Sequence, residues 1–404
     1  MQEQLKIAGA FVGVIVGAGF ASGRELLLFF VDFGVWGLVG ALVSAALFTF
    51  LGMALAALGN RQQATSHKDV IQAICGRHLG LFVDWLITFF MFAVTVVMLA
   101  GGGALLEQQF GIPALTGSVL VTLVVVGIVC LDVRKVILAI GAITPLLILV
   151  ASAIALYAVF TREQSFAALD HLASQQQAGT RHWLLGAFLY VSYNIVAGAP
   201  ILAILGGSAK GEKTAMWGGL LGGAALGGLM LVMSAGLLSR LDSVADLPMP
   251  MLSIASEVSP LLGLVMCLII FGMIVNTAVG TLFSFLSRLL PAGTAKFRWG
   301  SVVTGVVAFG CSLVGFISLV GEVYPFFGYL GFVLMAAVLL AWVRRGRAVK
   351  AKVVRSPIAG KPAPTGIFRA YGQRFGCGSW LAGDWASTGG NRRWPLPSMT
   401  GLKS

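Results

Sequence analysis

The sequence predicts an all-α membrane protein of about ten transmembrane helices, built as a five-plus-five inverted repeat with discontinuous first and sixth helices. Composition is the first observation behind this class: of 404 residues, 58% are hydrophobic and only 10% are charged, and the mean hydropathy is +0.94. Soluble domains carry about a quarter charged residues. The other two observations are the division of the chain into long apolar runs and the alternation of basic residues between the loops.

The apolar runs give the expected spans, since a transmembrane helix needs about 20 mainly apolar residues. We expect spans near residues 7–31, 35–58, 80–106, 113–131, 136–160, 182–206, 214–238, 260–289, 300–319 and 323–343. The first run is too long for the apolar part of a cleaved signal peptide, and we interpret it as a span.

Basic residues in the short loops predict the orientation, because Lys and Arg concentrate on the cytoplasmic side. One side receives a base-rich set: Lys6, Arg61, Lys68, Arg77, Arg134, Lys135, Lys210, Lys213, Arg288, Lys296, Arg298, Arg344, Arg345 and Arg347. The other side receives mainly acids and few bases. The pattern predicts a multi-pass protein of the bacterial inner membrane with both termini in the cytoplasm.

Ten spans divide into two sets of five, and an odd number per set inverts the second set relative to the first. We expect a transmembrane domain over residues 1–354, with one repeat near 7–160 and the other near 182–343. Residues 355–404 are rich in Gly, Ser, Pro, Trp and Arg without a structural period, which is typical of a disordered tail, here cytoplasmic.

The first run is interrupted by "GAGFASGRE", residues 17–25, in the middle of the expected span. Ser22 and Glu25 have the spacing of a capping box, in which the serine caps a new helix and the glutamate returns to the serine N–H. The pattern predicts a half-helix that ends around Val16 and a second that begins near Gly23.

The sixth run carries a matching interruption, Ala197–Gly198–Ala199–Pro200, and proline suits the first turn of a helix. One break alone could be a simple kink. Two breaks at corresponding repeat positions favour a site, because the starts of half-helices attract a carboxylate and their ends present carbonyls to a cation.

Arg24 and Glu25 lie inside the first run, where ionisable residues are by default functional candidates for coupling or gating. Glu25 has three candidate roles. It could be a structural cap, the partner of Arg24 in an outer gate, or a proton acceptor in a coupled cycle.

The eighth run contributes Thr277, Gly280 and Thr281 to one helix face. Their hydroxyls could complete a Na⁺ site, since hard cations prefer oxygen ligands. Alternatively, such hydroxyls bond only to their own backbone.

The opening segment "GAFVGVIVGAGFASGRELLLFF", followed by "FG", and the later "TAVG" resemble the YkvI-like bacterial membrane proteins. These are relatives of the amino acid-polyamine-organocation transporter superfamily, which has the leucine-transporter-like fold. The resemblance covers about residues 5–345. It implies substrate contacts from Gly17, Ala18, Gly19, Ala21, Ser22, Tyr193, Asn194 and Gly198. It also implies a Na⁺ site made of Gly13 and Val16 carbonyls with Thr277 and Thr281.

We therefore expect a secondary active transporter that moves a small organic solute, for example an amino acid, by alternating access coupled to Na⁺ or H⁺. The alternative is a receptor that keeps the transporter fold and binds a solute without moving it.

An enzyme is disfavoured because no H-E-x-x-H or G-x-S-x-G motif lies in a span. We expect no cofactor beyond Na⁺ and no nucleic-acid partner, because the excess of 12 positive charges is scattered rather than laid along one face. The residues carry no indication of oligomeric state.

Overall fold

A computed structural model describes residues 1–64, 67–131, 143–162, 164–173, 175 and 179–343, and all regular structure in these ranges is helical. The helices are α1 (Gln2–Ile15), α2 (Ala18–Ser22), α3 (Arg24–Phe29), the 3₁₀ turn η1 (Val31–Phe33), α4 (Gly34–Arg61), α5 (His67–Phe110), α6 (Ala114–Cys130), α8 (Ile143–Phe160), α9 (Phe166–Ala173), α10 (Trp183–Ser208), α11 (Glu212–Leu238), α12 (Leu241–Val244), α13 (Pro250–Val258), α14 (Pro260–Leu289), α15 (Ala295–Ser312) and α16 (Phe316–Val343). The tail predicted to be disordered, residues 355–404, lies outside the described residues.

Seven helical segments of the described chain are long and apolar enough to cross a membrane: Arg24–Arg61, Ile74–Phe110, Ile143–Phe160, Trp183–Ser208, Glu212–Leu238, Pro260–Leu289 and Phe316–Val343. The other three expected spans correspond to the broken first run, to the 17-residue helix α6 and to α15. The protein is therefore a multi-pass membrane protein, while the count of ten and the inverted repeat stay predictions.

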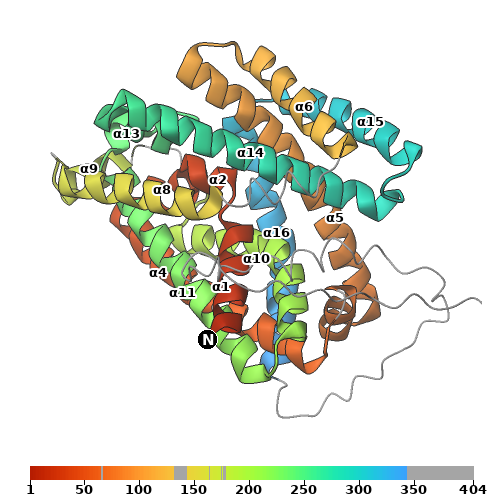
Figure 1. The fold of residues 1–404 in the computed structure, drawn as a ribbon. Coiled ribbons are helices and arrows are strands. Elements are labelled where there is room, and N and C mark those ends of the chain that lie inside the picture. Colours follow the sequence, from red (N-terminus) through yellow and green to blue (C-terminus); the bar gives the residue numbers. More distant parts are fainter. Residues whose placement is uncertain (65–66, 132–142, 163, 174, 176–178, 344–404) are drawn as a thin grey trace, which may run out of the picture.

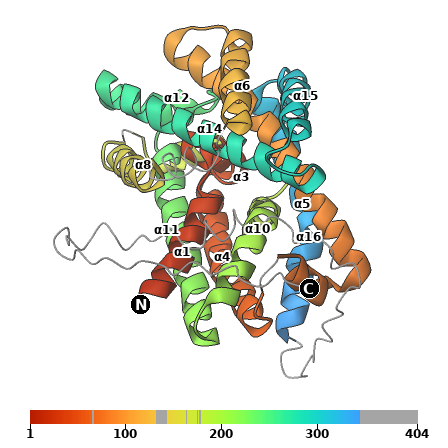
Figure 2. The ribbon, with the colours of Figure 1, turned by 45° about the vertical axis from the view of Figure 1, so that its right-hand side comes forward.

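The helices form two packed groups, which Figures 1 and 2 show from two directions. In the first group, α4 packs along both α10 and α11, and α1 lies against α10 and α11. In the second group, α5 packs along α14 and α6, and α15 contacts α5, α6 and α14. The short helix α2 touches α14 of the second group, so the interruption of the first span lies where the two groups meet.

Glycines on α11 allow the first group to pack closely, as their small-xxx-small spacing predicts. A Cβ on Gly219 would overlap the backbone of Gly52 on α4, and a Cβ on Gly223 would overlap the α4 backbone at Phe48 and Thr49. The backbones of α4 and α11 therefore approach each other too closely for any side chain at these positions.

The predicted break in the sixth span is wrong. Helix α10 runs without interruption from Trp183 to Ser208 and contains Pro200 in its interior. Proline removes one backbone hydrogen bond and crowds the preceding turn, but membrane helices tolerate it where neighbouring groups pack around the site. Here Pro200 is buried and the turn before it holds only the small residues Ala197, Gly198 and Ala199.

The ninth and tenth spans also differ from prediction. Helix α15 ends at Ser312, seven residues before the expected boundary, because Gly315 adopts a left-handed conformation with φ of 100° and α16 begins at Phe316. The proline-marked segment 243–258, which precedes the eighth span, contains the nine-residue helix α13.

Candidate functional site

The first span breaks at Val16 and Gly17. Helix α1 ends at Ile15, and Gly17 is extended with φ of −97° and ψ of −169°. The Gly17 N–H donates to the carbonyl of Ile15 at 2.8 Å, where a continuous helix would bond it to Gly13. The Gly13 carbonyl therefore loses its regular partner, as expected for a half-helix that ends around Val16.

A second joint follows five residues later at Gly23, which has φ of 83°. This left-handed conformation is accessible to glycine at little cost. The helix α2 between the two joints is buried: Ala18, Gly19, Phe20, Ala21 and Ser22 all lie in the interior. The chain therefore crosses this region as three pieces, α1, α2 and α3, instead of the two half-helices that the sequence predicts.

The capping-box prediction is only half right. Ser22 Oγ accepts a hydrogen bond from the Arg24 N–H at 3.2 Å and donates to the Gly19 carbonyl at 2.8 Å. The carboxyl group of Glu25 points away to α10, where Glu25 Oε2 accepts a hydrogen bond from the Tyr193 hydroxyl at 2.8 Å. A long-range partner has replaced the local backbone N–H that the capping box would use.

Glu25 is 6% exposed and lies in an aromatic environment. The rings of Tyr193 and Tyr324 stack with centroids 4.9 Å apart and planes 4° from parallel, and the Tyr324 hydroxyl is a second hydrogen-bonding neighbour of the carboxyl. On the other side the carboxyl lies against Gly19, where a Cβ would overlap Glu25 Oε1. Glu25 thus joins α3 to α2, α10 and α16.

Arg24 does not pair with Glu25, so the predicted outer gate between these two residues is not formed. Its guanidinium donates to the carbonyl oxygens of Ala245 at 2.6 Å and Leu247 at 3.4 Å, in the segment between α12 and α13. Asp32 and Asp246 are its acidic neighbours. Arg24 therefore connects α3 to this segment, and its positive charge lies near these two acids.

The remaining residues expected to bind substrate are divided between two places. Tyr193 is connected to the break by the hydrogen bond that its hydroxyl donates to Glu25. Asn194 is buried, but its side-chain amide donates to the Tyr190 carbonyl of its own helix at 2.9 Å. Gly198 packs against Phe11 and Ile15, on the part of α1 that precedes the break. The structure brings Gly17, Ala18, Gly19, Ala21, Ser22 and Tyr193 together, and it leaves Asn194 and Gly198 at the edge.

The expected Na⁺ ligands are also only partly brought together. Thr277 lies opposite the break, since a Cβ on Gly17 would be 3.7 Å from Thr277 Oγ1. Thr281 Oγ1 is 2.8 Å from Thr95 Oγ1 of α5 and bonds to the Thr277 carbonyl of its own helix. Val16 is buried, whereas Gly13 is exposed. In the described ranges no group of three or more His, Cys, Asp or Glu residues could hold a metal ion.

Sequence reasoning missed Tyr324, Thr95 and Tyr190. Thr95 occurs singly in an apolar run, whereas Tyr190 lies in the same stretch as Ser192, Tyr193 and Asn194. Tyr324 directly precedes Pro325 inside α16, and that pairing of an isolated polar residue with a helix-disturbing proline was a usable signal. Thr95 had no local signal, because its partner lies 186 residues away.

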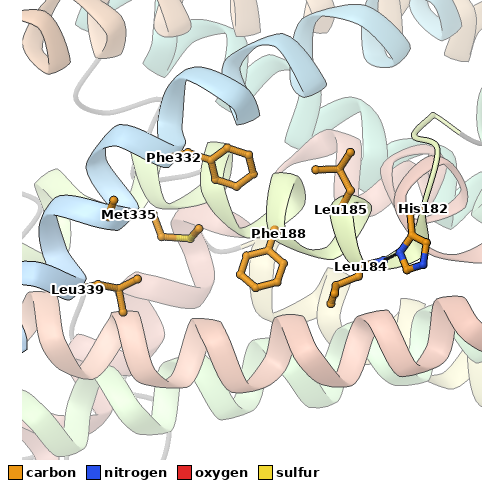
Figure 3. Close-up of a pocket in the computed structure, with 8 residues that line it drawn as sticks. His182, Leu184, Leu185, Phe188, Phe332, Met335 and Leu339 are labelled. Atoms are coloured by element: carbon orange, nitrogen blue, oxygen red, sulfur yellow. Dashed lines mark hydrogen bonds between the residues drawn. The ribbon is translucent and has the colours of Figure 1, made fainter.

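A separate apolar groove lies between α10 and α16, with a volume of about 530 Å³. Figure 3 shows it lined by Leu185, Phe188, Phe332, Met335 and others, with His182 at one end. Its lining contains none of the residues at the break. An apolar groove of this kind does not suit a charged or polar solute, so we place the candidate site at the break.

The chain is 30% identical over 349 residues to the membrane protein YkvI of Bacillus subtilis (strain 168), a match that covers 85% of this chain and 97% of YkvI. It belongs to the YkvI-like family of bacterial membrane proteins. A second relative, YyaD of the same organism, is 27% identical over 330 residues, covering 81% of this chain and 94% of YyaD. The sequence matches no protein-family model.

Solved structures show which fold this YkvI-like chain has. It is similar to MhsT in complex with L-phenylalanine, with a TM-score of 0.56 and 14% identity over 92% of this chain and 96% of that one. It also resembles a manganese transporter of Eremococcus coleocola (TM-score 0.53, 14% identity, 91% and 90% covered) and a Na⁺-coupled sialic acid symporter (0.52, 12%, 81% and 78%). The YkvI-like chain therefore has the leucine-transporter-like fold.

Proposed function

We propose that this protein is a secondary active transporter of the inner membrane that moves a small organic solute, such as an amino acid, by alternating access. The first group of helices would rock against the second around the break at Gly17, driven by a Na⁺ or H⁺ gradient and with both termini in the cytoplasm. The observation that carries the proposal is the buried interruption of the first span at the junction of the two groups. In hydrocarbon, unpaired backbone is tolerated only where it is buried in protein or lines a polar cavity.

Buried polar groups around the break support a polar solute. Ser22, Glu25 and Tyr193 lie there. The fully buried Tyr190 hydroxyl neighbours Asn194 and Tyr193, but it has no partner at regular hydrogen-bonding geometry among the described residues. An unpaired buried hydroxyl is costly, and a bound solute or water molecule would satisfy it. The structural neighbours include proteins described as a manganese transporter and a sialic acid symporter, which agrees with transport as the activity of this fold.

Two measurements test the proposal. Purified protein in lipid nanodiscs would be heated with each of the twenty amino acids, with and without Na⁺. A ligand at a hundred times its Kd adds about 2.7 kcal/mol to the folded state, so a substrate would raise the unfolding temperature. The stabilising amino acid, radiolabelled, would then be offered to proteoliposomes under an imposed Na⁺ or H⁺ gradient. Accumulation above equilibrium supports transport, whereas binding without net movement would make the protein a receptor.

A Na⁺ site formed by the carbonyls of Gly13 and Val16 with Thr277 and Thr281 is part of the proposal. The free Gly13 carbonyl and the position of Thr277 opposite Gly17 support it. Thr277→Val keeps the shape of the side chain and removes its hydroxyl. We expect it to weaken the affinity for Na⁺ on the order of tenfold, or about 1.4 kcal/mol, which a Na⁺ titration of the unfolding temperature would measure. Thr122→Val is the control, since Thr122 bonds to Ser118 within α6. Equal Na⁺ titrations of both variants and wild type would remove Thr277 from the site.

A further inference from the structure

Glu25 is a buried acid without a cationic partner. None of the ion pairs among the described residues includes it, since these join Arg61 to Glu212, Lys210 to Glu3, Arg240 to Glu257 and Arg288 to Asp84. The nearest base along the chain, Arg24, points to the carbonyls of Ala245 and Leu247. The carboxyl group of Glu25 is instead approached by the hydroxyls of Tyr193 and Tyr324.

The groups that face Glu25 from the surrounding elements are all neutral. Helix α10 presents Tyr190 and Tyr193, and α16 presents Tyr324. Helix α2 presents Gly19, where a Cβ would overlap the Glu25 carboxyl. The charged groups nearby, Asp32 of η1 and Asp246 before α13, are acids that neighbour Arg24. Glu322 on α16 is exposed.

A carboxylate in such surroundings is unstable, because burying an uncompensated charge costs more than a hydroxyl hydrogen bond returns. The charge must be cancelled by a proton or by a bound cation. A cation needs room beside the carboxyl, whereas Tyr193, Tyr324 and Gly19 pack closely around it. A proton needs no additional space, so the packing favours a protonated carboxyl in this arrangement.

We propose that Glu25 binds the coupling proton of this transporter. In the arrangement seen here a carboxyl oxygen holds the proton while Oε2 accepts the hydrogen bond from Tyr193. When α3 moves away from α10 and water reaches the group, the O–H bond breaks and the proton passes to water, leaving a hydrated carboxylate. Neither tyrosine loses its own proton in this step. The coupling role rests on the proposed function, but the proton itself does not.

The position of Glu25 explains how its proton would control movement. The carboxyl lies on α3, contacts α2 across the Gly23 joint, and bonds to α10. A neutral carboxyl can be buried against these three elements, and an ionised one is stabilised by leaving them for water. Proton binding would thus favour closure of α3 onto α10.

The proton can be measured directly by infrared difference spectroscopy of the full chain in nanodiscs, recorded between about pH 5 and about pH 9 without any solute. We expect a protonated-carboxyl band in wild type that is lost in Glu25→Gln and kept in Glu322→Gln. Glu25→Asp, which keeps a titratable group, should show a displaced band. An ionised Glu25 throughout this range would overturn the proposal and point to a cationic ligand.

The pH dependence of thermal stability gives a second test. Ionising Glu25 in the closed arrangement places an unpaired charge in the aromatic cluster, so wild type should unfold at a lower temperature as the pH rises. Glu25→Gln cannot ionise, and this contribution should be absent, whereas Glu322→Gln should follow wild type. Identical profiles for wild type and Glu25→Gln would contradict the inference even if the protein transports a solute. A protonated Glu25 in a protein that moves no solute would instead refute the transport proposal.

Discussion

Replacing Gly223 with alanine is expected to destabilise the folded protein by about 1–3 kcal/mol, and by more if α4 cannot shift. The added Cβ would lie 2.5 Å from the carbonyl carbon of Phe48, inside the backbone of α4. Backbone atoms in the middle of a 28-residue helix cannot move aside as a side chain can. The measurement is the unfolding temperature of the variant in nanodiscs, together with the amount of folded protein recovered from membranes.

The matched control for Gly223 lies on the same helix. A Cβ on Gly228 meets nothing within 4 Å, so Gly228→Ala should be neutral or slightly stabilising, because alanine is preferred to glycine in helices by about 1 kcal/mol. Equal stability of the two variants would show that the α4–α11 interface is looser than the structure indicates.

Gly19→Ala is expected to separate Glu25 from Tyr193 and to lower gradient-driven uptake. A Cβ at Gly19 would overlap the Glu25 carboxyl, and that side chain can give way only by leaving its position against α10. Overpacking of about 1–3 kcal/mol corresponds to roughly 5- to 150-fold in an equilibrium between closed and open arrangements. Uptake into proteoliposomes and the infrared band of Glu25 report the two consequences separately.

Gly9→Ala serves as the comparison for Gly19, since a Cβ on this exposed residue of α1 meets nothing within 4 Å. We expect it to keep wild-type uptake and the wild-type infrared band. Full uptake by Gly19→Ala, with the band unchanged, would mean that Glu25 does not depend on its contact with α2.

The sequence predicted the class of protein, the approximate positions of the helices and the interruption of the first span. These follow from local patterns: long apolar runs, and three glycines within residues 17–23 that weaken the helix there. The break predicted in α10 failed for the same reason, because a local proline signal cannot show whether surrounding helices hold the turn in place. Pro200 is buried, and packing maintains the helix around it.

The partners within the site could not be predicted, because they are distant in sequence. Glu25 and Tyr193 were both expected at the site, yet the spacing of Ser22 and Glu25 indicated a local cap. The hydrogen bond that replaces it joins residues 168 positions apart. Helical spacing placed Thr277 and Thr281 on one face, as observed, but it could not show that Thr281 bonds to Thr95 on another helix.

The two joints at Gly17 and Gly23 leave a helix of five residues that is covalently linked at both ends through flexible positions. A change of backbone torsions at these two glycines can reorient α2 without bending α1 or α3. The smallest moving part of this protein would then be a single turn of helix rather than a whole span. In the proposed transport cycle, this short helix would be able to move before the two helix groups do.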